Sequence, residues 1–446
     1  MKQLFGTDGI RGHAGVFPLD ERTVKIIGAS LARQFRERSG RNPCFVSGRD
    51  TRESGEWIEA ALCSGAEQEG AQCLSSGVIT TPGIAFLTNE FGMDAGIVIS
   101  ASHNPYEDNG IKVFSPSGKK IDDVTERKIE IDVHKSMSVD VEHNEQLDTS
   151  RQAEFCSAYI DHLVQKSRPF ERRQRIVIDC ANGAASSLAG EVFGRINADL
   201  IIINNCPDGR NINAACGSLY LEKLQERVLA EHADIGIAFD GDADRALFVN
   251  ELGDIVDGDA TLWILARYLN RHGKLRNSKV VATVMSNIGL ELALRSIGIQ
   301  LIRSSVGDKY VLEQLLATGA EIGGEQSGHI IFPENSLVGD GMMTALLIMR
   351  AIGEQNATLS EATRGFTAFP QILNNVRVRE KLPFESIAPI AEAARKVEAD
   401  LDGHGRLLLR YSGTENLARV MIEGLDQAEI EILANHLADV IRASIG

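Results

Sequence analysis

Three aspartates at alternate positions carry the clearest chemical signal in the sequence. Asp240, Asp242 and Asp244 follow the apolar run 235–239, and their carboxylates can turn toward one point where the chain curls after a strand. Hard oxygen ligands of this kind suit Mg²⁺. The spacing also fits the start of a calcium loop, but Arg245 stands where such a loop needs glycine. We therefore predict a magnesium site, with a solvated acidic turn as the ordinary alternative.

A second polar loop places a serine directly after another apolar run. The letters SASHNP at 100–105 follow the glycine-led run 96–99. A serine hydroxyl acts as a nucleophile when something lowers the cost of charge on its oxygen. We predict that Ser102 is exposed on this turn and open to in-line attack. Taken alone, the segment is more simply interpreted as an ordinary turn.

Two further loops combine groups that can bind a phosphorylated sugar. GEQSGH at 324–329 offers a carboxylate, a hydroxyl and an imidazole for sugar hydroxyls, although alone it is equally a polar hairpin. RYSGTEN at 410–416 joins accessible backbone N–H groups to a planar guanidinium, a set that suits a phosphate dianion. The sequence contains neither GxxxxGK[ST] nor a GxGxxG after a strand, so the fingerprints of nucleotide sites are missing.

Short strands and longer helices alternate around these loops. Apolar stretches predict buried strands at 96–99, 175–178, 200–203, 235–239 and 279–282. Helical periodicity predicts helices at 53–70, 219–231 and 260–270. This alternation predicts α/β layers with largely parallel strands, and ligands in such layers bind at strand ends. An acidic residue and a glycine-containing apolar run precede three of the loops, which indicates related domains.

The length of 446 residues exceeds what one compact core normally holds. The pattern changes near 142–151, 250–259 and 366–371. We predict three related α/β domains and a smaller C-terminal α+β domain. The predicted boundaries are 1–150, 151–252, 253–367 and 368–446.

The net charge argues against some classes of partner, and the cysteines and the lack of long apolar runs indicate where the protein is located. The net charge is −16, from 46 basic and 62 acidic residues, which argues against nucleic acid and anionic membranes as partners. Seven scattered cysteines without a CxxC pair indicate reduced thiols. No apolar run has the length of a signal peptide or of a transmembrane helix. The sequence therefore predicts a cytoplasmic protein.

The four loops together resemble a known family. Taken in chain order, they look like the four signature loops of the α-D-phosphohexomutase superfamily: SASHNP, DGDADR, GEQSGH and RYSGTE. Each motif is moderately specific, and all four in order across nearly the whole chain are highly specific. FGTDGIRG at 5–12, Ala101 and Gln326 resemble the phosphoglucosamine mutase branch. Ala243, Tyr411 and Asn416 depart from the pattern of many relatives without removing a functional side chain.

The resemblance implies a fold and a reaction. The three α/β domains would have mixed sheets around a central cleft, over which the C-terminal domain closes. A phosphoryl group stored on Ser102 would pass to glucosamine 6-phosphate, and the resulting glucosamine 1,6-bisphosphate would return its other phosphoryl group and leave glucosamine 1-phosphate. One Mg²⁺ per site, held by Ser102 and the three aspartates, would offset the transferring charge. Glucosamine 1,6-bisphosphate or glucose 1,6-bisphosphate would act as activator, and the product would feed UDP-N-acetylglucosamine synthesis.

The resemblance also implies which residues act. The catalytic set would surround the moving phosphoryl group and comprises Ser102, Arg11, His103, Lys112, Arg245 and His329. Lys112 and His329 are alternatives for proton transfer to and from the sugar hydroxyl.

The substrate-binding set would hold the sugar hydroxyls and the non-reacting phosphate. It comprises Gly307, Asp308, Lys309, Glu325, Ser327, Arg410, Ser412, Gly413, Thr414 and Arg419. Three alternatives remain at this point: the same chemistry as a phosphomannomutase/phosphoglucomutase, an inactive phosphosugar-binding protein, and a phosphatase. A homodimer is implied by the resemblance alone.

Overall fold

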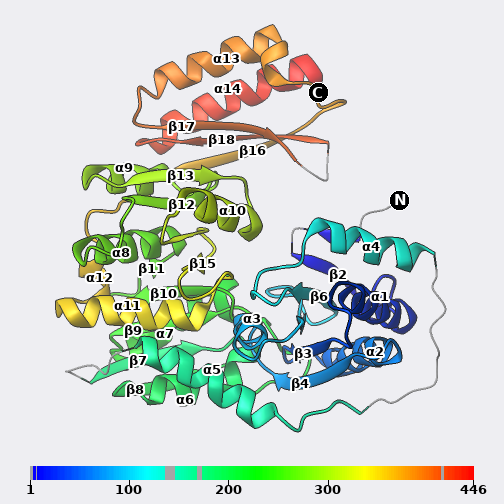
Figure 1. Ribbon diagram of the computed structural model, residues 1–446. Helices are drawn as coiled ribbons and strands as arrows, with labels where there is room; N and C mark the ends of the chain where they lie inside the picture. Colours follow the sequence, from blue (N-terminus) through cyan, green and yellow to red (C-terminus); the bar gives the residue numbers. More distant parts are fainter. Residues whose placement is uncertain (1–3, 7, 136–145, 168–172, 413–415) are drawn as a thin grey trace. The chain divides into compact units, whose positions relative to one another are not determined.

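The computed structural model describes residues 4–6, 8–135, 146–167, 173–412 and 416–446. Its strands form four sheets with helices packed on them (Figure 1). The chain divides into two compact units, which are described separately below. One comprises 1–283 and 302–364, and the other comprises 284–301 and 365–446. The predicted fold class, three α/β domains followed by a smaller α+β domain, is confirmed.

The first sheet contains six strands from the N-terminal part of the chain. In order across the sheet they are β1 (Phe5–Gly6), β2 (Gly9–His13), β6 (Asp108–Phe114), β5 (Ala95–Ile99), β3 (Cys44–Arg49) and β4 (Gln72–Val78). β3 runs parallel to β4 and β5, and the other pairs are antiparallel. The sheet is therefore mixed, and the expectation of largely parallel strands is wrong for its β1–β2–β6 side.

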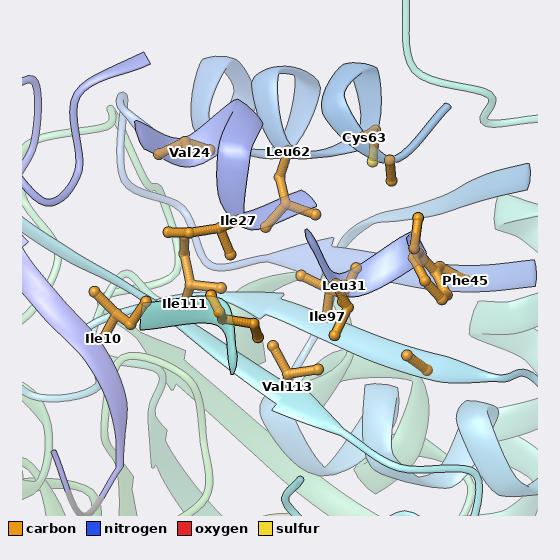
Figure 2. Close-up of a cluster of buried hydrophobic side chains, with 14 of the residues drawn as sticks. Ile10, Val24, Ile27, Leu31, Phe45, Leu62, Cys63, Ile97, Ile111 and Val113 are labelled. Atoms are coloured by element: carbon orange, nitrogen blue, oxygen red, sulfur yellow. The ribbon is translucent and has the colours of Figure 1, made fainter. Parts of the chain in front are cut away.

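Two helices of this domain pack unusually closely above the sheet. They are α1 (Glu21–Ser39) and α2 (Gly55–Gln68), the helix predicted at 53–70. A Cβ added to Gly28 would lie 2.0 Å from the backbone oxygen of Leu62, and one added to Gly65 would lie 2.0 Å from that of Lys25. Figure 2 shows Ile27 and Leu62 in the apolar layer between these helices and the strands. The glycines are needed because backbone meets backbone at this crossing.

Two more helices of this domain pack against the sheet and against α1. α3 (Thr81–Glu90) contacts β3 and β5, and α4 (Asp123–His134) contacts α1. The side chain of Thr80 accepts a hydrogen bond from the backbone of Gly83 and so caps α3. This cap places Thr81 at the start of the helix, where it meets the aspartate loop described below.

The second sheet carries the aspartate loop. In order across the sheet its strands are β11 (Ile255–Val256), β10 (Ala246–Asn250), β9 (Ile235–Phe239), β7 (Gln174–Asp179) and β8 (Ala198–Ile203). Helices α6 (Ala189–Gly194) and α7 (Glu222–Glu231) pack against it, and α5 (Gln152–Lys166) contacts α6 and also β4 of the first sheet. The strand predicted at 235–239 is β9 and is fully buried. The strand predicted at 200–203 lies in β8, but it is half-exposed because β8 is an edge strand.

The third α/β part contains short strands around the 324–329 loop. β12 (Lys279–Thr283) pairs in parallel with β14 (Gly323–Gly324), which pairs antiparallel with β15 (Ile330–Ile331). GEQSGH is therefore the turn of a β-hairpin. The other elements between residues 258 and 362 are α8 (Gly258–Arg271), α9 (Ile288–Ser296), β13 (Gln300–Ser304), α10 (Asp308–Thr318), α11 (Gly341–Gln355) and α12 (Leu359–Ala362).

The C-terminal sheet has three antiparallel strands in the order β16 (Gln371–Arg377), β18 (Leu417–Glu423), β17 (Arg406–Tyr411). α13 (Ala388–Asp400) and α14 (Gln427–Ile445) cover one face of it (Figure 1). This is the predicted α+β arrangement. Across the described ranges, every helix is too short or too polar to cross a bilayer.

Candidate active site

The serine loop and the aspartate loop lie against each other in the first unit. The serine loop connects β5 to β6, and the aspartate loop connects β9 to β10. The hydroxyl of Ser102 donates a hydrogen bond to Oδ2 of Asp240 at 2.6 Å. A Cβ added to Gly241 would lie 2.5 Å from the backbone oxygen of Ser102. The two loops thus meet at van der Waals contact, and glycine is required where they do.

The burial of Ser102 differs from the prediction. The residue is 1% exposed, because the aspartate loop covers the turn that was expected to be open. Its backbone has a φ of 54°, and Ala243 in the facing loop also has a φ of 54°. Left-handed angles at residues other than glycine are uncommon and cost free energy. The left-handed φ accounts for the glycine that many relatives have at the position of Ala243.

The three aspartates form a group that can hold a metal ion. One carboxylate oxygen from each of Asp240, Asp242 and Asp244 lies within 4.8 Å of the others, and all three residues are buried. Oδ1 of Asp242 is buried and has no hydrogen-bond partner among the described residues. Burial, Asp244 and Asp242 together raise the pKa of Asp240 well above its usual value. A buried cluster of like charges with an unpaired oxygen fits a divalent cation as counter-charge.

Lys112 lies among the carboxylates of this cluster. Its Nζ is 2.9 Å from Asp242, 3.1 Å from Asp8 and 3.2 Å from Asp244. Burial alone would lower the pKa of Lys112, but the three carboxylates outweigh burial and raise it well above the usual value. The ammonium group therefore stays protonated.

His329 contacts the same cluster from the β14–β15 hairpin. Its Nδ1 lies 3.6 Å from Oδ1 of Asp244, and its Nε2 accepts a hydrogen bond from the backbone N–H of Gly339 at 3.0 Å. Burial lowers the pKa of His329, but Asp244, Asp308 and Glu325 raise it to about 8. Full protonation would break the bond from Gly339, since a protonated Nε2 cannot accept. Near pH 7 a ring with this pKa is mostly protonated, and the neutral form that accepts from Gly339 gains population above about pH 8.

A cavity of about 430 Å³ opens beside these groups. Eight of the residues predicted for the site line this cavity: Arg11, His103, Asp244, Arg245, Gly307, Asp308, Glu325 and His329. Burial, Arg245 and Arg11 lower the pKa of His103 to about 4, so its ring is neutral near pH 7. A second cavity of about 510 Å³, lined in part by Gln152 and Cys156, contains none of the predicted site residues.

Two predicted sugar ligands lie away from the cavity lining. Nζ of Lys309 pairs with Oδ1 of Asp123 at 2.5 Å on the surface. Oγ of Ser327 is buried without a hydrogen-bond partner in the described part of the chain. Glu325 does line the cavity, and its Oε1 accepts a hydrogen bond from the backbone N–H of Gly307 at 3.0 Å.

Sequence reasoning missed two charged residues of this site. Asp8 contacts Lys112 as described and pairs with Arg11 at 2.5 Å and Lys120 at 2.6 Å. Lys120 also pairs with Asp308 at 2.6 Å. Asp8 could have been found, since it stands in the FGTDGIRG segment beside Arg11. Lys120 follows an ordinary turn, and no sequence signal marks it.

The fourth predicted loop lies in the second unit. Arg410 of β17 stands opposite Arg419 of β18. Burial and Arg419 lower the pKa of Arg410 below its usual value. Nζ of Lys381 donates to the backbone oxygen of Ser412 at 2.7 Å, and Ser412 is buried. Gly413 and Thr414 lie outside the described residues. Two adjacent guanidinium groups repel each other, and a bound anion would relieve that repulsion.

A buried serine beside a metal-competent triad, at a cavity that Arg11 and Arg245 also line, is a site suited to phosphoryl transfer. Models of the phosphoglucomutase/phosphomannomutase family match alpha/beta/alpha domains I, II and III over residues 2–140, 157–253 and 257–369, and the C-terminal domain over 373–440. The chain therefore belongs to this family, and its predicted place in the α-D-phosphohexomutase superfamily is confirmed. These enzymes are isomerases. The domain boundaries given above stay predictions.

Individual relatives narrow the comparison. The phosphoglucosamine mutase of Solibacter usitatus is 46% identical over 445 residues, with 100% of this chain and 99% of the relative covered. A phosphoglucomutase/phosphomannomutase family protein from Burkholderia thailandensis has the same fold, with a TM-score of 0.80, 22% identity, and 100% and 98% coverage. Aspergillus fumigatus N-acetylphosphoglucosamine mutase, solved with GlcNAc-6P and magnesium, matches with a TM-score of 0.67, 18% identity, and 99% and 96% coverage.

Proposed function

We propose that this enzyme is a phosphoglucosamine mutase, which interconverts glucosamine 6-phosphate and glucosamine 1-phosphate through a phosphoserine at Ser102. The observation that carries the proposal is the 2.6 Å hydrogen bond between the hydroxyl of Ser102 and Asp240. This bond supports Ser102 as the nucleophile, because it joins the hydroxyl to a buried carboxylate triad. Full-length identity of 46% to a phosphoglucosamine mutase supports the choice of sugar. Phosphomannomutase/phosphoglucomutase activity is the alternative within the same family.

In the proposed reaction, the sugar hydroxyl attacks the phosphorus of phosphoserine, a new P–O bond to the sugar forms, and the bond to Oγ of Ser102 breaks. The bisphosphate then reorients in the site and presents its other phosphoryl group to the same oxygen. In the first transfer the sugar hydroxyl loses a proton and the leaving Oγ of Ser102 gains one. In the second transfer Oγ loses that proton and the sugar oxygen that gives up its phosphoryl group gains one. Free glucosamine 1,6-bisphosphate or glucose 1,6-bisphosphate would serve as activator, since it can load an unphosphorylated serine.

Mg²⁺ is the metal we propose for the triad. Asp240, Asp242, Asp244 and an oxygen of phosphorylated Ser102 would hold it, and it would supply charge stabilisation for the transferring group. All four donors are oxygens, which is the ligand type that Mg²⁺ prefers. The magnesium solved with the Aspergillus relative supports this choice.

The cations and His329 have separate roles in this proposal. Arg11, Arg245 and the protonated Lys112 would stabilise charge on the phosphoryl oxygens. Lys112 is a poor base because its carboxylate partners keep it protonated. We therefore assign proton transfer to His329, whose pKa of about 8 lies near neutral pH and whose ring lines the cavity. The neutral ring of His103, whose Nδ1 lies 3.3 Å from Oγ of Ser102, would help to orient that oxygen.

Candidate substrate-binding residues occur in each of the two units. In the first unit, Gly307 and Glu325 at the cavity would contact sugar hydroxyls. In the second unit, Arg410 and Arg419, with Ser412 and the loop after it, would bind the non-reacting phosphate. The positions of Lys309 and Ser327 make them weaker candidates than the sequence indicated. A cytoplasmic location, a homodimer and supply of an amino-sugar precursor for the cell envelope complete the proposal.

Mass spectrometry of phosphorylated enzyme tests the proposal. The purified protein is loaded with glucosamine 1,6-bisphosphate and Mg²⁺, and peptide mapping locates the added phosphoryl group. We expect one group on Ser102, which glucosamine 6-phosphate discharges into a sugar bisphosphate. The Ser102→Ala variant should take up none. Discharge into free phosphate would instead indicate a phosphatase, and a large preference for glucose or mannose phosphate would indicate the alternative mutase.

A further inference from the structure

One buried guanidinium group lies beneath the serine loop and collects its backbone oxygens. Arg52, in the turn after β3, donates to the backbone oxygen of Ser102 at 2.9 Å, of Asn104 at 2.8 Å and of Asp108 at 3.0 Å, and also to that of Pro105. Its side chain is fully buried. Four carbonyl groups of one loop therefore converge on a single side chain.

The same cluster also fixes the start of the serine loop. Asp50 pairs with Nε of Arg52 at 2.9 Å and accepts a hydrogen bond from the hydroxyl of Ser100 at 2.6 Å. That hydroxyl in turn accepts a bond from the backbone N–H of Ser102 at 2.9 Å. The N–H and the C=O of Ser102 are thus both held by the Asp50–Arg52 ion pair, directly or through one hydroxyl group.

A second donor reaches the same carbonyl groups from the other domain. Nδ2 of Asn213, in the segment between β8 and α7, donates to the backbone oxygen of Ser102 at 2.9 Å and of Asn104 at 3.0 Å. Asn213 also stands beside the aspartate loop, because a Cβ added to Gly241 would lie 3.0 Å from its Nδ2. It therefore connects the loop that carries the nucleophile to the domain that carries the triad.

We propose that Arg52 and Asn213 are positioning residues for phosphoryl transfer: they hold Ser102 in its left-handed conformation and aim its Oγ at the aspartate loop. This inference rests on the proposed function of Ser102. A serine with a φ of 54° occupies a sparsely populated backbone region. The hydrogen bonds from Arg52 and Asn213 stabilise that conformation. Removing the bonds of either residue should loosen the serine loop and leave every group that contacts the phosphoryl group in place.

Three variants test this role. Asn213→Ala removes both bonds from the second domain and leaves the buried Arg52–Asp50 pair intact. Arg52→Lys keeps the charge but cannot reach four carbonyl groups and Asp50, since an ammonium group has three donors in place of a planar fork of five. Asn211→Ala is the control, because the Asn211 side chain bonds Cys206 and Asp208 in the same segment and not the serine loop.

The measurement is single-turnover discharge of phosphorylated Ser102 by glucosamine 6-phosphate, with amide hydrogen exchange of the peptide that spans 100–110. For Asn213→Ala and Arg52→Lys we expect discharge to slow by about 10–100-fold, with the sugar concentration at half-maximal rate changed less than about twofold. Exchange of the 100–110 peptide should accelerate in both, and Asn211→Ala should match wild type. A loss of sugar binding would instead raise the sugar concentration at half-maximal rate. The expected result therefore distinguishes a positioning role from a sugar-binding role.

The inference is overturned if Asn213→Ala and a soluble Arg52→Lys discharge at the wild-type rate, or if discharge slows without a change in loop exchange. If Asn213→Ala does not fold, Asn213→Asp replaces it, because aspartate has the same shape and no Nδ2 donor. Wild type is tested in parallel. Failure of wild type to discharge would refute the proposed function itself, whereas normal discharge in wild type and variants refutes the positioning role alone.

Discussion

Lys112 gives a sharp test of the electrostatics of the site. The change Lys112→Met removes the ammonium group and keeps much of the side-chain volume. Its Nζ is buried 2.9–3.2 Å from three carboxylates, those of Asp8, Asp242 and Asp244. In the variant Asp242 and Asp244 stay buried, Asp8 stays partly buried, and all three lose their shared counter-charge.

The size of the effect follows from these distances. At about 3 Å and an effective dielectric constant of ~20, each contact contributes about 5 kcal/mol of gross attraction. Burial of the ammonium group opposes this by several kcal/mol. Removal of one partner from a buried ion pair typically lowers the free energy of unfolding by about 3–5 kcal/mol. We expect a loss of that size in metal-free buffer and a clear recovery at saturating Mg²⁺, which would supply the missing positive charge.

Urea titration followed by tryptophan fluorescence measures this loss. The chain has two tryptophans, so the change Trp263→Phe is made in every protein compared and leaves Trp57, in the first domain, as the reporter. Lys25→Met is the control: Lys25 is also buried, but its partner Glu21 is half-exposed and can be solvated when the lysine is gone. The reasoning is refuted if Lys112→Met is within about 0.5 kcal/mol of wild type without metal. Equal stabilisation by Mg²⁺ in variant and wild type would refute it as well.

Three further predictions concern other parts of the chain. Burial raises the pKa of Asp340 from 3.8 to about 6, so the folded state holds a proton that the unfolded chain releases between these values, and wild-type stability falls as pH rises through this window. Urea titrations should show the free energy of unfolding of Asp340→Asn, relative to that of wild type, rising by on the order of 2–3 kcal/mol from pH 4 to pH 7. A difference that does not change with pH would contradict this. Gly65→Ala, 2.0 Å from a backbone oxygen of Lys25, should lower the free energy of unfolding by about 1–3 kcal/mol or more, whereas Gly194→Ala, with open space around it, should not. Arg410→Met should raise KM for the phosphosugar about tenfold or more with little change in kcat, and a fall in kcat alone would argue against a binding role.

Much of the fold could be predicted because strand and loop signals coincide. β9 matches its predicted range, and α2 and α8 lie within two residues of their predicted starts. These segments are buried and periodic, so tertiary contacts reinforce the local pattern. β8 shows the limit: an apolar run looks the same in a central strand and in an edge strand, and the order of strands in the sheet decides its exposure.

The site could be predicted as four loops but not as a three-dimensional arrangement. Types and spacing indicated the triad, and the resemblance of the four loops to a known family indicated Ser102. The burial of Ser102 could not be foreseen, because the covering loop comes from a position 138 residues away. Lys120 and Asn213 lie outside every motif, and they act through contacts with residues distant in sequence. Such contacts are set by domain packing, which no local pattern encodes.

Phosphorylation of Ser102 should change the affinity of the triad for its metal. In the unphosphorylated chain the hydroxyl of Ser102 donates a hydrogen bond to Asp240, and this bond satisfies part of the hydrogen-bonding capacity of the triad. Phosphorylation removes that donor and places about −1.5 to −2 charges beside buried carboxylates. The phosphoserine is then strongly repelled unless a divalent cation lies between it and the aspartates. A cation that stabilises the phosphoserine must itself be bound more tightly when the phosphoserine is present. We therefore expect phosphorylated protein to bind Mg²⁺ at least about tenfold more tightly than unphosphorylated protein in calorimetric titrations without sugar. Equal affinity in the two forms would mean that the serine oxygen is not a ligand and that the aspartates hold the metal alone.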